Sequence, residues 1–331
     1  MPRTLKLHIG LPKTGTSSLQ KMLITHESKL KEINYIYPKS GRWNDGSHHE
    51  VALAFGVKQN AGDGKLTHKK FAKPVNTVEI QKGLITEIES TSDYSTIILS
   101  SEFFGISQCS NLLIDFCKQY FDVIDLFICL RRQSDLFESL LSQVIKNPNA
   151  CFTDSKRKIF TNNMQFFNYF ELLNHWEEKL KPDSINIFRY KIESVKDILN
   201  SLISTFDWDQ VEFDHANKNI TPQPDKVRLM YLLNHLEMSD TARTELYRVL
   251  AKKTKNKEFS LPLVSAFEAL LIEKIYEETN FLVSQKYFDG EALFDKSQKS
   301  HGRFSLEEKL WDFGLNSRDL LNLLNSYELS S

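Results

Sequence analysis

Residues 5–23 decide the fold, and their sequence is LKLHIGLPKTGTSSLQKML. The run from Leu5 to Gly10 is short and mostly apolar and ends in glycine, and an amphipathic pattern follows from Ser17 to about Lys31. A strand, a glycine-rich loop and a helix are therefore expected in this order. Such a loop brings unpaired backbone N–H groups and the positive end of a helix dipole to one point, so the stretch predicts an anion site.

The order of residues in the loop narrows the choice of anion. Gly10 and Gly15 have the spacing of the nucleoside triphosphatase loop, but Thr16 stands where that motif has its lysine, and Lys13 precedes the second glycine instead. A lysine on the loop itself can contact a bridging oxygen between a phosphate and a transferable group. Further donors come from the hydroxyls of Thr14, Thr16, Ser17 and Ser18.

Strands and helices alternate through the first two thirds of the chain. Further strands are expected at Tyr35–Tyr37, Thr96–Ser101, Val123–Leu130 and Ser184–Tyr190. Helical patterns occupy about Val75–Ser90, Asn111–Tyr120, Ser134–Ile145, Met164–Leu180 and Ser194–Thr205. This alternation predicts an α/β fold with a central parallel sheet and right-handed crossovers.

The last third of the chain has helical periodicity only. No strand-like run follows residue 222, and a leucine-rich pattern at Arg318–Leu329 predicts a final helix. Without an internal repeat or a low-complexity linker, we expect an α/β core over residues 1–222 and a helical part over residues 223–331 packed on the same domain.

A second signature follows the most apolar strand. Arg131 comes directly after Val123–Leu130, and Ser139 follows eight residues later in a helix whose apolar stripe faces away from it. An arginine fork binds phosphate through paired charge-assisted hydrogen bonds. A salt bridge at the strand end is the alternative reading of Arg131. However, both signatures lie at carboxyl ends of parallel strands, which is where open α/β sheets bind ligands.

The two signatures together resemble a known family. HIGLPKTGTSS, residues 8–18, is similar to the 5'-phosphosulfate loop of the PAPS-dependent sulfotransferases, where PAPS is 3'-phosphoadenosine 5'-phosphosulfate. LRRQ followed by the ESL helix resembles the 3'-phosphate motif of bacterial members. The likeness covers about residues 4–240 by motif order. It implies a P-loop-like three-layer fold without a metal site.

The resemblance also implies an activity and a set of cofactor-binding residues. PAPS would be the sulfate donor, PAP the product, and a carbohydrate hydroxyl the acceptor. The cofactor-binding residues that it implies are Lys13, Thr14, Gly15, Thr16, Ser17, Ser18, Arg131, Ser139 and Tyr190. Tyr190 would lie near the adenine, although Lys191 stands where relatives have an acidic residue.

Such a transfer needs a general base for the acceptor hydroxyl. Besides Lys13, which would stabilise the leaving phosphate, the catalytic candidates are His49 and Glu102. His49 belongs to SHHE, with His48 and Glu50 beside it, and Glu102 follows the strand Thr96–Ser101. Imidazole titrates in the useful range, whereas a carboxylate needs burial to raise its pKa. A surface helix start or a helix cap is the structural alternative, and the choice stays open.

The bulk composition excludes some classes of partner. The formal net charge of -1 gives no reason to expect a nucleic acid, and HExxH is absent, so no metal is expected. The N-terminus has no apolar run long enough for a signal peptide and no later run is long enough to span a membrane, which predicts a cytoplasmic protein without a membrane span. The bacterial type is implied by the resemblance alone. Buried or free thiols are expected at Cys109, Cys117, Cys129 and Cys151.

Two other functions compete with sulfuryl transfer. A P-loop kinase or triphosphatase is disfavoured by Thr16, although Glu102 could serve as an acidic residue after a strand. A non-catalytic relative that binds PAP or a glycan would keep the loop without turnover. The C-terminal helices could pack on the domain or form a homodimer contact.

Overall fold

The computed structural model describes residues 2–56, 76–91, 95–106, 110–148, 152–190, 195–208, 211, 224–235, 239–251 and 262–295. The predicted helix at Arg318–Leu329, Cys109 and Cys151 lie outside the described residues. The described residues belong to two compact units. The first consists of residues 1–132, 165–213 and 278–294, and the second of residues 133–164, 214–277 and 295–331. The predicted division of the chain at residue 222 stays a prediction.

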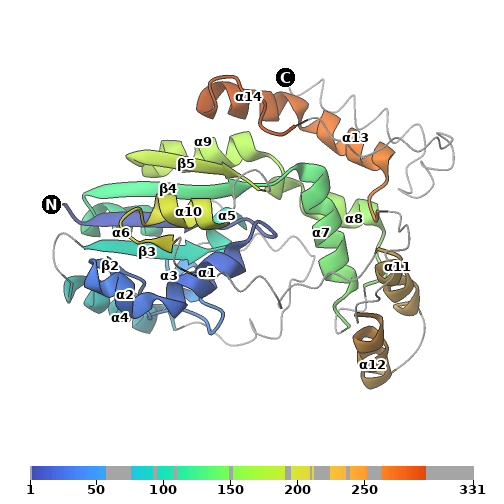
Figure 1. Ribbon diagram of the computed structural model, residues 1–331, viewed down its shortest axis with the longest axis horizontal. Helices are drawn as coiled ribbons and strands as arrows, with labels where there is room; N and C mark the ends of the chain where they lie inside the picture. The colour runs from blue at the N-terminus through green and yellow to red at the C-terminus, as the bar shows by residue number, and fades with distance from the viewer. Residues whose placement is uncertain are drawn as a thin grey trace. The chain divides into compact units, whose positions relative to one another are not determined.

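A five-stranded parallel sheet forms the centre of the first unit (Figure 1). Its strand order is β2-β3-β1-β4-β5. The strands are β1 Thr4–Ile9, β2 Tyr35–Ile36, β3 Thr96–Ser101, β4 Val123–Leu130 and β5 Ser184–Arg189. All paired strands run parallel, with β1 between β3 and β4. The prediction of an α/β fold with a central parallel sheet flanked by helices is confirmed.

Alternation along the strands gives the sheet two apolar faces. In β4, Leu126 and Ile128 belong to one buried cluster, while Phe127 and Cys129 belong to another on the opposite face. This follows from the two-residue period of a strand. A strand that is apolar on both faces is expected in a parallel sheet covered by helices on each side.

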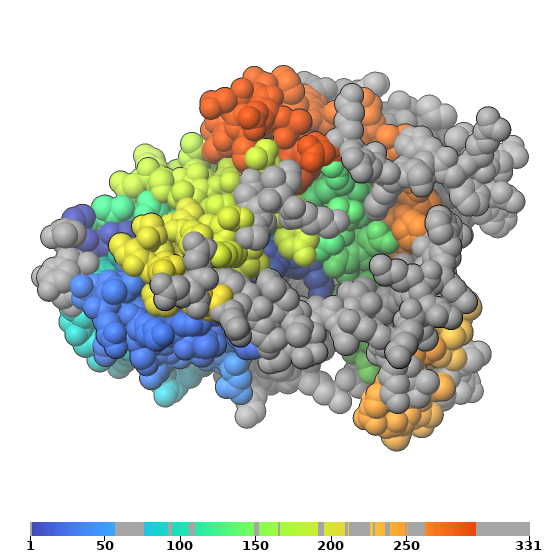
Figure 2. Space-filling model, in the orientation of Figure 1, coloured from blue at the N-terminus to red at the C-terminus, as the bar shows by residue number. Residues whose placement is uncertain are grey.

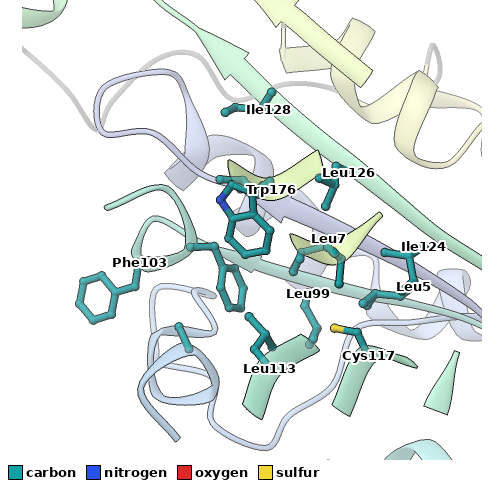
Figure 3. Close-up of a cluster of buried hydrophobic side chains, with 14 of the residues drawn as sticks. Leu5, Leu7, Leu99, Phe103, Leu113, Cys117, Ile124, Leu126, Ile128 and Trp176 are labelled. Carbon is teal, nitrogen blue, oxygen red and sulfur yellow. The ribbon is translucent and has the colours of Figure 1, made fainter. Parts of the chain in front are cut away.

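Helices α3, α4, α5, α6 and α9 contribute to the first cluster. Their bounds are α3 His49–Ala54, α4 Thr77–Glu89, α5 Phe103–Ile106, α6 Asn111–Tyr120 and α9 Tyr169–Leu180. Figure 3 shows Trp176 of α9 beside Leu126 and Leu7, with Leu113 and Cys117 of α6 in the same cluster. Helix α14, Glu277–Tyr287, adds Val283 to it. The short helices α3 and α5 were not predicted.

Helices α1, α2 and α10 contribute to the second cluster. They span α1 Thr16–Thr25, α2 Glu27–Glu32 and α10 Val195–Leu202, and α1 and α10 lie side by side (Figure 2). The sequence predicted one helix from Ser17 to Lys31, but the structure divides it at His26. His26 is the C-terminal cap residue of α1 and the N-terminal cap residue of α2, and its ring lies 5.6 Å from the rings of both Phe206 and Trp208.

The described part of the second unit is helical. Its helices are α7 Gln133–Ile145, α8 Lys156–Asn162, α11 Pro224–Leu233, α12 Asp240–Ala251 and α13 Ala266–Ile275. Helix α7 packs against α8, α11 and α13. The single helix predicted at Met164–Leu180 is instead a 3-10 turn, Met164–Phe166, followed by α9.

Cys117 and Cys129 are both buried, as predicted for the cysteines. In the part of the chain that the structure describes, no helix combines the length and the apolar character needed to span a membrane.

Candidate functional site

The loop between β1 and α1 is pressed against the carboxyl end of β3. The Gly10 amide donates to the Ser101 carbonyl over 3.0 Å. A Cβ atom on Gly10 would lie 3.1 Å from the Glu102 backbone and 3.0 Å from the Thr16 side chain. A side chain at this position would force its neighbours to shift, so glycine suits the close approach of the loop to β3.

The loop adopts two left-handed backbone conformations before α1 begins. Lys13 has φ 65° and Gly15, the residue before the helix, has φ 90°. Gly15 provides no side-chain cap, and among the described residues no backbone carbonyl accepts from the N–H groups of residues 13–17. Unpaired amides at the N-terminus of a ten-residue helix form a site suited to an anion.

The four loop hydroxyls have different surroundings. The Thr14 hydroxyl is buried and donates to the Leu11 carbonyl over 2.8 Å. The Thr16 hydroxyl donates to a Glu102 carboxylate oxygen over 2.6 Å. Ser17 and Ser18 are exposed. The hydroxyls of Thr14 and Thr16 thus support the loop, while those of the two serines face solvent, and the binding role of all four stays a prediction.

Three charged side chains influence one another at this edge of the sheet. Burial lowers the pKa of the Lys13 ammonium, the Glu102 charge raises it, and the Arg131 charge lowers it again. Burial raises the pKa of the Glu102 carboxyl, while the Thr16 hydrogen bond and the Lys13 charge oppose this shift. The structure therefore brings together Lys13 and Glu102, two of the predicted catalytic residues, and Arg131 from the second signature.

Arg131 is attached directly to the loop. Its Nη1 donates to the Lys13 carbonyl over 2.7 Å, and its guanidinium lies 4.8 Å from the centre of the Tyr190 ring. Tyr190 in turn approaches the loop, because a Cβ atom on Gly15 would lie 4.0 Å from its ring. The Nε of Arg131 is buried and has no hydrogen-bond partner among the described residues. These contacts are hydrogen bonding to the backbone and ring packing, and the phosphate-binding role of Arg131 stays a prediction.

Ser139 lies on α7 in the second unit, whereas Arg131 directly follows β4 in the first. Ser139 is half-buried. Its pairing with Arg131 around one phosphate stays a prediction.

His49 is the first residue of α3 and is buried. Its Nδ1 lies 2.8 Å from the hydroxyl of Ser101, the last residue of β3. Its ring stacks on Phe103 at 4.1 Å between centroids and 15° between planes, and Trp43 approaches edge-on at 4.7 Å. His49 is therefore next to the residue that precedes Glu102, so both candidate bases lie at the same end of β3.

His48 has a different environment. Its Nε2 lies 2.9 Å from the Pro38 carbonyl oxygen, and its Nδ1 accepts from the Ser100 amide over 3.2 Å. Because a carbonyl oxygen can only accept, Nε2 carries the hydrogen and both nitrogens are used. Burial lowers the pKa of His48 to about 3. These contacts argue against His48 as the base and leave His49, Glu50 and Glu102.

Ser101 and Gln20 were not predicted as site residues. Gln20 donates to the Ser100 hydroxyl over 3.0 Å, and His8 Nδ1 lies 2.8 Å from the same hydroxyl. The two serines in LSSEFF, at the end of a predicted strand and before Glu102, were the available signal. Their partners could not be inferred, because those partners come from other elements.

Comparisons with known proteins found a solved structure whose likeness to this chain is weak. No protein-family model matches the chain, and no curated protein matches it. One solved structure to which it is similar is a "Sulfotransferase Domain from the Curacin Biosynthetic Pathway", with 13% sequence identity and a TM-score of 0.36. The match covers 84% of this chain and 98% of that one. At this identity and TM-score the likeness carries no argument about this chain.

Proposed function

We propose that the chain is a PAPS-dependent sulfotransferase that transfers a sulfuryl group to a hydroxyl acceptor, and that the acceptor is a carbohydrate. One observation carries the proposal, namely the 2.7 Å hydrogen bond from Arg131 to the Lys13 carbonyl. The two residues lie 118 positions apart and belong to the two signatures that resemble opposite ends of one nucleotide site. Their contact is what a single bisphosphorylated adenosine would require.

The residues present are suited to a nucleotide with two phosphate groups. The unpaired amides before α1 would bind the 5'-phosphate. Arg131 would bind the 3'-phosphate, and its buried Nε without a partner marks a donor that the protein itself does not satisfy. Tyr190 lies beneath that arginine, so its ring is within reach of the same nucleotide. We propose that no metal takes part, since phosphate charge can be met by these donors.

PAPS, when bound, supplies the activated sulfuryl group. Transfer by in-line displacement depends on positioning and on stabilisation of developing charge. Lys13 and the loop amides would stabilise the negative charge that grows on the 5'-phosphate oxygen as its bond to sulfur breaks. A base at the end of β3 would take the acceptor proton. Lys13 and Glu102 interact electrostatically, so these two tasks are performed side by side.

The proposal is tested by following label from ³⁵S-PAPS into a panel of polysaccharides with EDTA present. The expected result is labelled product with release of PAP. Lys13→Ala is expected to lose the activity, and Lys29→Ala, on an exposed face of α2, is the matched lysine control. PAP binding without cofactor consumption on any acceptor would instead indicate a non-catalytic relative.

A P-loop kinase or triphosphatase remains the competing function. The hydrogen bond from Thr16 to Glu102 is the observation in its favour, because it joins the start of the helix to an acidic residue after a strand. Thr16 nevertheless occupies the position where that mechanism needs lysine. Tight binding of ATP that depends on Mg²⁺, with no binding of PAP, would favour the kinase and contradict the sulfotransferase.

A further inference from the structure

The hydroxyl of Ser101 determines how His49 can act. Ser101 is fully buried, so no solvent satisfies its hydroxyl group. The oxygen accepts from the Phe103 amide over 3.1 Å and lies 2.8 Å from His49 Nδ1. Among the described residues the Ser101 hydroxyl has no other partner. Within the described part of the chain, its hydrogen therefore has one acceptor within reach, the Nδ1 of His49.

A hydroxyl donates one hydrogen and can accept two. If His49 Nδ1 carried a hydrogen, the Ser101 oxygen would accept twice and its own hydrogen would be buried without an acceptor. An unmet buried donor costs more than a typical hydrogen bond contributes. If Nδ1 accepts instead, the Ser101 hydrogen, the Phe103 amide and His49 Nδ1 all have partners. The second arrangement places the ring hydrogen of neutral His49 on Nε2.

We propose that Ser101 holds His49 as the Nε2–H tautomer, which makes His49 a hydrogen-bond donor and leaves Glu102 to take the acceptor's proton. Ser101 is then a positioning residue that acts through His49. In this state the one lone pair of the neutral ring is occupied by the Ser101 hydroxyl, so the ring can take a proton only by breaking that bond. The inference rests on the proposed function for the role of Glu102, and on geometry alone for the tautomer.

The step balances with the groups present. The acceptor oxygen forms a bond to sulfur, the bond from sulfur to the 5'-phosphate oxygen breaks, and its electron pair stays on that phosphate oxygen. The acceptor proton goes to the Glu102 carboxylate. Thr16 holds one oxygen of that carboxylate. The charges of Lys13 and Asp45 act on it in opposite directions. A buried carboxylate with a raised pKa is a better proton acceptor than an exposed one.

The tautomer is tested by ¹⁵N NMR of the histidine ring nitrogens in the full-length protein, with the His49 signals identified by their loss in His49→Gln. The expected pattern at neutral pH has a protonated Nε2 and an unprotonated Nδ1. Ser101→Ala is expected to shift the pattern toward a mixture. A protonated Nδ1 in the wild-type protein would overturn the tautomer, whether or not the protein transfers sulfate.

Kinetics test the division of roles. Gln at position 49 keeps an N–H near the position of Nε2 but cannot accept a proton, so His49→Gln is expected to stay within about tenfold of wild-type kcat/KM and to keep the acid limb of its pH profile. Glu102→Gln is expected to reduce kcat/KM by about 10²- to 10⁴-fold and to abolish the acid limb of its pH profile. The reverse pattern would overturn the assignment. No turnover by the wild-type protein would refute the proposed function and the role of Glu102 with it, while the NMR result would still decide the tautomer.

Discussion

At the scale of single residues, the loop before α1 divides its polar side chains between support and binding. Thr14 and Thr16 are held by the Leu11 carbonyl and by Glu102. Lys13 has no hydrogen-bond partner for its ammonium among the described residues, and burial lowers its pKa. Lys13 is half-buried, and the nearby Glu102 charge favours its charged form. The catalytic role of Lys13 stays a proposal.

Lys13→Ala is expected to separate turnover from binding. Under the proposed function, Lys13 would act on charge that develops only in the transition state, so its loss is expected to reduce transfer by about 10²- to 10³-fold. It should weaken PAP binding less than Arg131→Ala does, since Arg131 would contact a phosphate that is present throughout. Single-turnover rates and PAP titrations of the two variants measure this difference. Equal losses of binding would contradict the two roles.

Thr16→Val is expected to change the pH dependence of the reaction. The Thr16 hydroxyl donates to Glu102 and so favours its charged form, which lowers the pKa of that carboxyl. Removing the hydroxyl should raise this pKa, and the acid limb of the profile of kcat/KM should move to higher pH. A limb that stays in place, in a variant that still binds PAP, would show that Glu102 is not the group being titrated.

At the scale of elements, the site depends on how closely the loop approaches its neighbours. A Cβ atom on Gly15 would lie 2.9 Å from Cγ2 of Val195, the first residue of α10. A Cβ atom on Gly105 in α5 would likewise collide with the Gly10 carbonyl oxygen. Residues from two helices are therefore in close contact with the loop.

Gly15→Ala is expected to destabilise the protein through both backbone and packing. The φ of 90° costs an alanine about 1–2 kcal/mol, and the contact with Val195 costs about 1–3 kcal/mol more. Gly56→Ala is the matched control, because Gly56 has φ 74° but its added Cβ would meet nothing closer than 3.6 Å. Urea unfolding should show a larger loss of stability for Gly15→Ala. Equal losses would mean that the approach of Val195 does not constrain the loop.

Many of the helices and strands could be predicted from the sequence. The bounds of β3, α6 and β4 agree with the apolar runs and periodic patterns residue for residue. The strand, loop and helix at residues 4–25 follow from one glycine-rich stretch. Helices α3 and α5 were missed because six and four residues are too few to show a 3.6-residue period. At the break, His26 contacts Phe206 and Trp208, about 180 residues away along the chain, and no local pattern contains that contact.

At the scale of the whole molecule, a buried polar network lies beneath the candidate site. His8 and Gln20 meet at the Ser100 hydroxyl, and His48 bonds to the Ser100 backbone. Burial lowers the pKa of His8 to about 4 and that of His48 to about 3. Both side chains are therefore neutral in the folded protein at pH values where the unfolded chain already binds protons.

The stability of the protein is expected to fall in acid for this reason. A histidine whose pKa is depressed by folding contributes its stability above the unfolded value of 6.5, and that contribution is lost as the pH falls toward about 4. For each of the two histidines, the free energy of unfolding should fall by about 1.4 kcal/mol per pH unit within that window. Urea unfolding at pH 7.5, 6 and 5 measures the slope. His8→Gln should reduce it, the exposed His235→Gln should not, and equal slopes in all three proteins would contradict the assignment.

The whole-molecule arrangement could be predicted only in part. The alternation of strands and helices predicted the parallel sheet, since two-sided apolar strands such as β4 require helices on both faces. The compact unit that contains α7 with α11 and α13 could not be foreseen, because it joins residues 133–164 to residues beyond 214. Likewise, the sequence placed Lys13 and Arg131 at the same edge of the sheet, but only the structure shows the hydrogen bond between them.

Calorimetric titration with PAP in EDTA tests whether the loop of Lys13 and the arginine after β4 bind one bisphosphorylated adenosine. Wild-type protein and Lys29→Ala are expected to bind PAP at one site without added metal. Arg131→Ala is expected to bind it about 10- to 100-fold more weakly, as loss of a charged hydrogen bond requires. Absence of PAP binding, or binding of ATP only with Mg²⁺, would contradict the account.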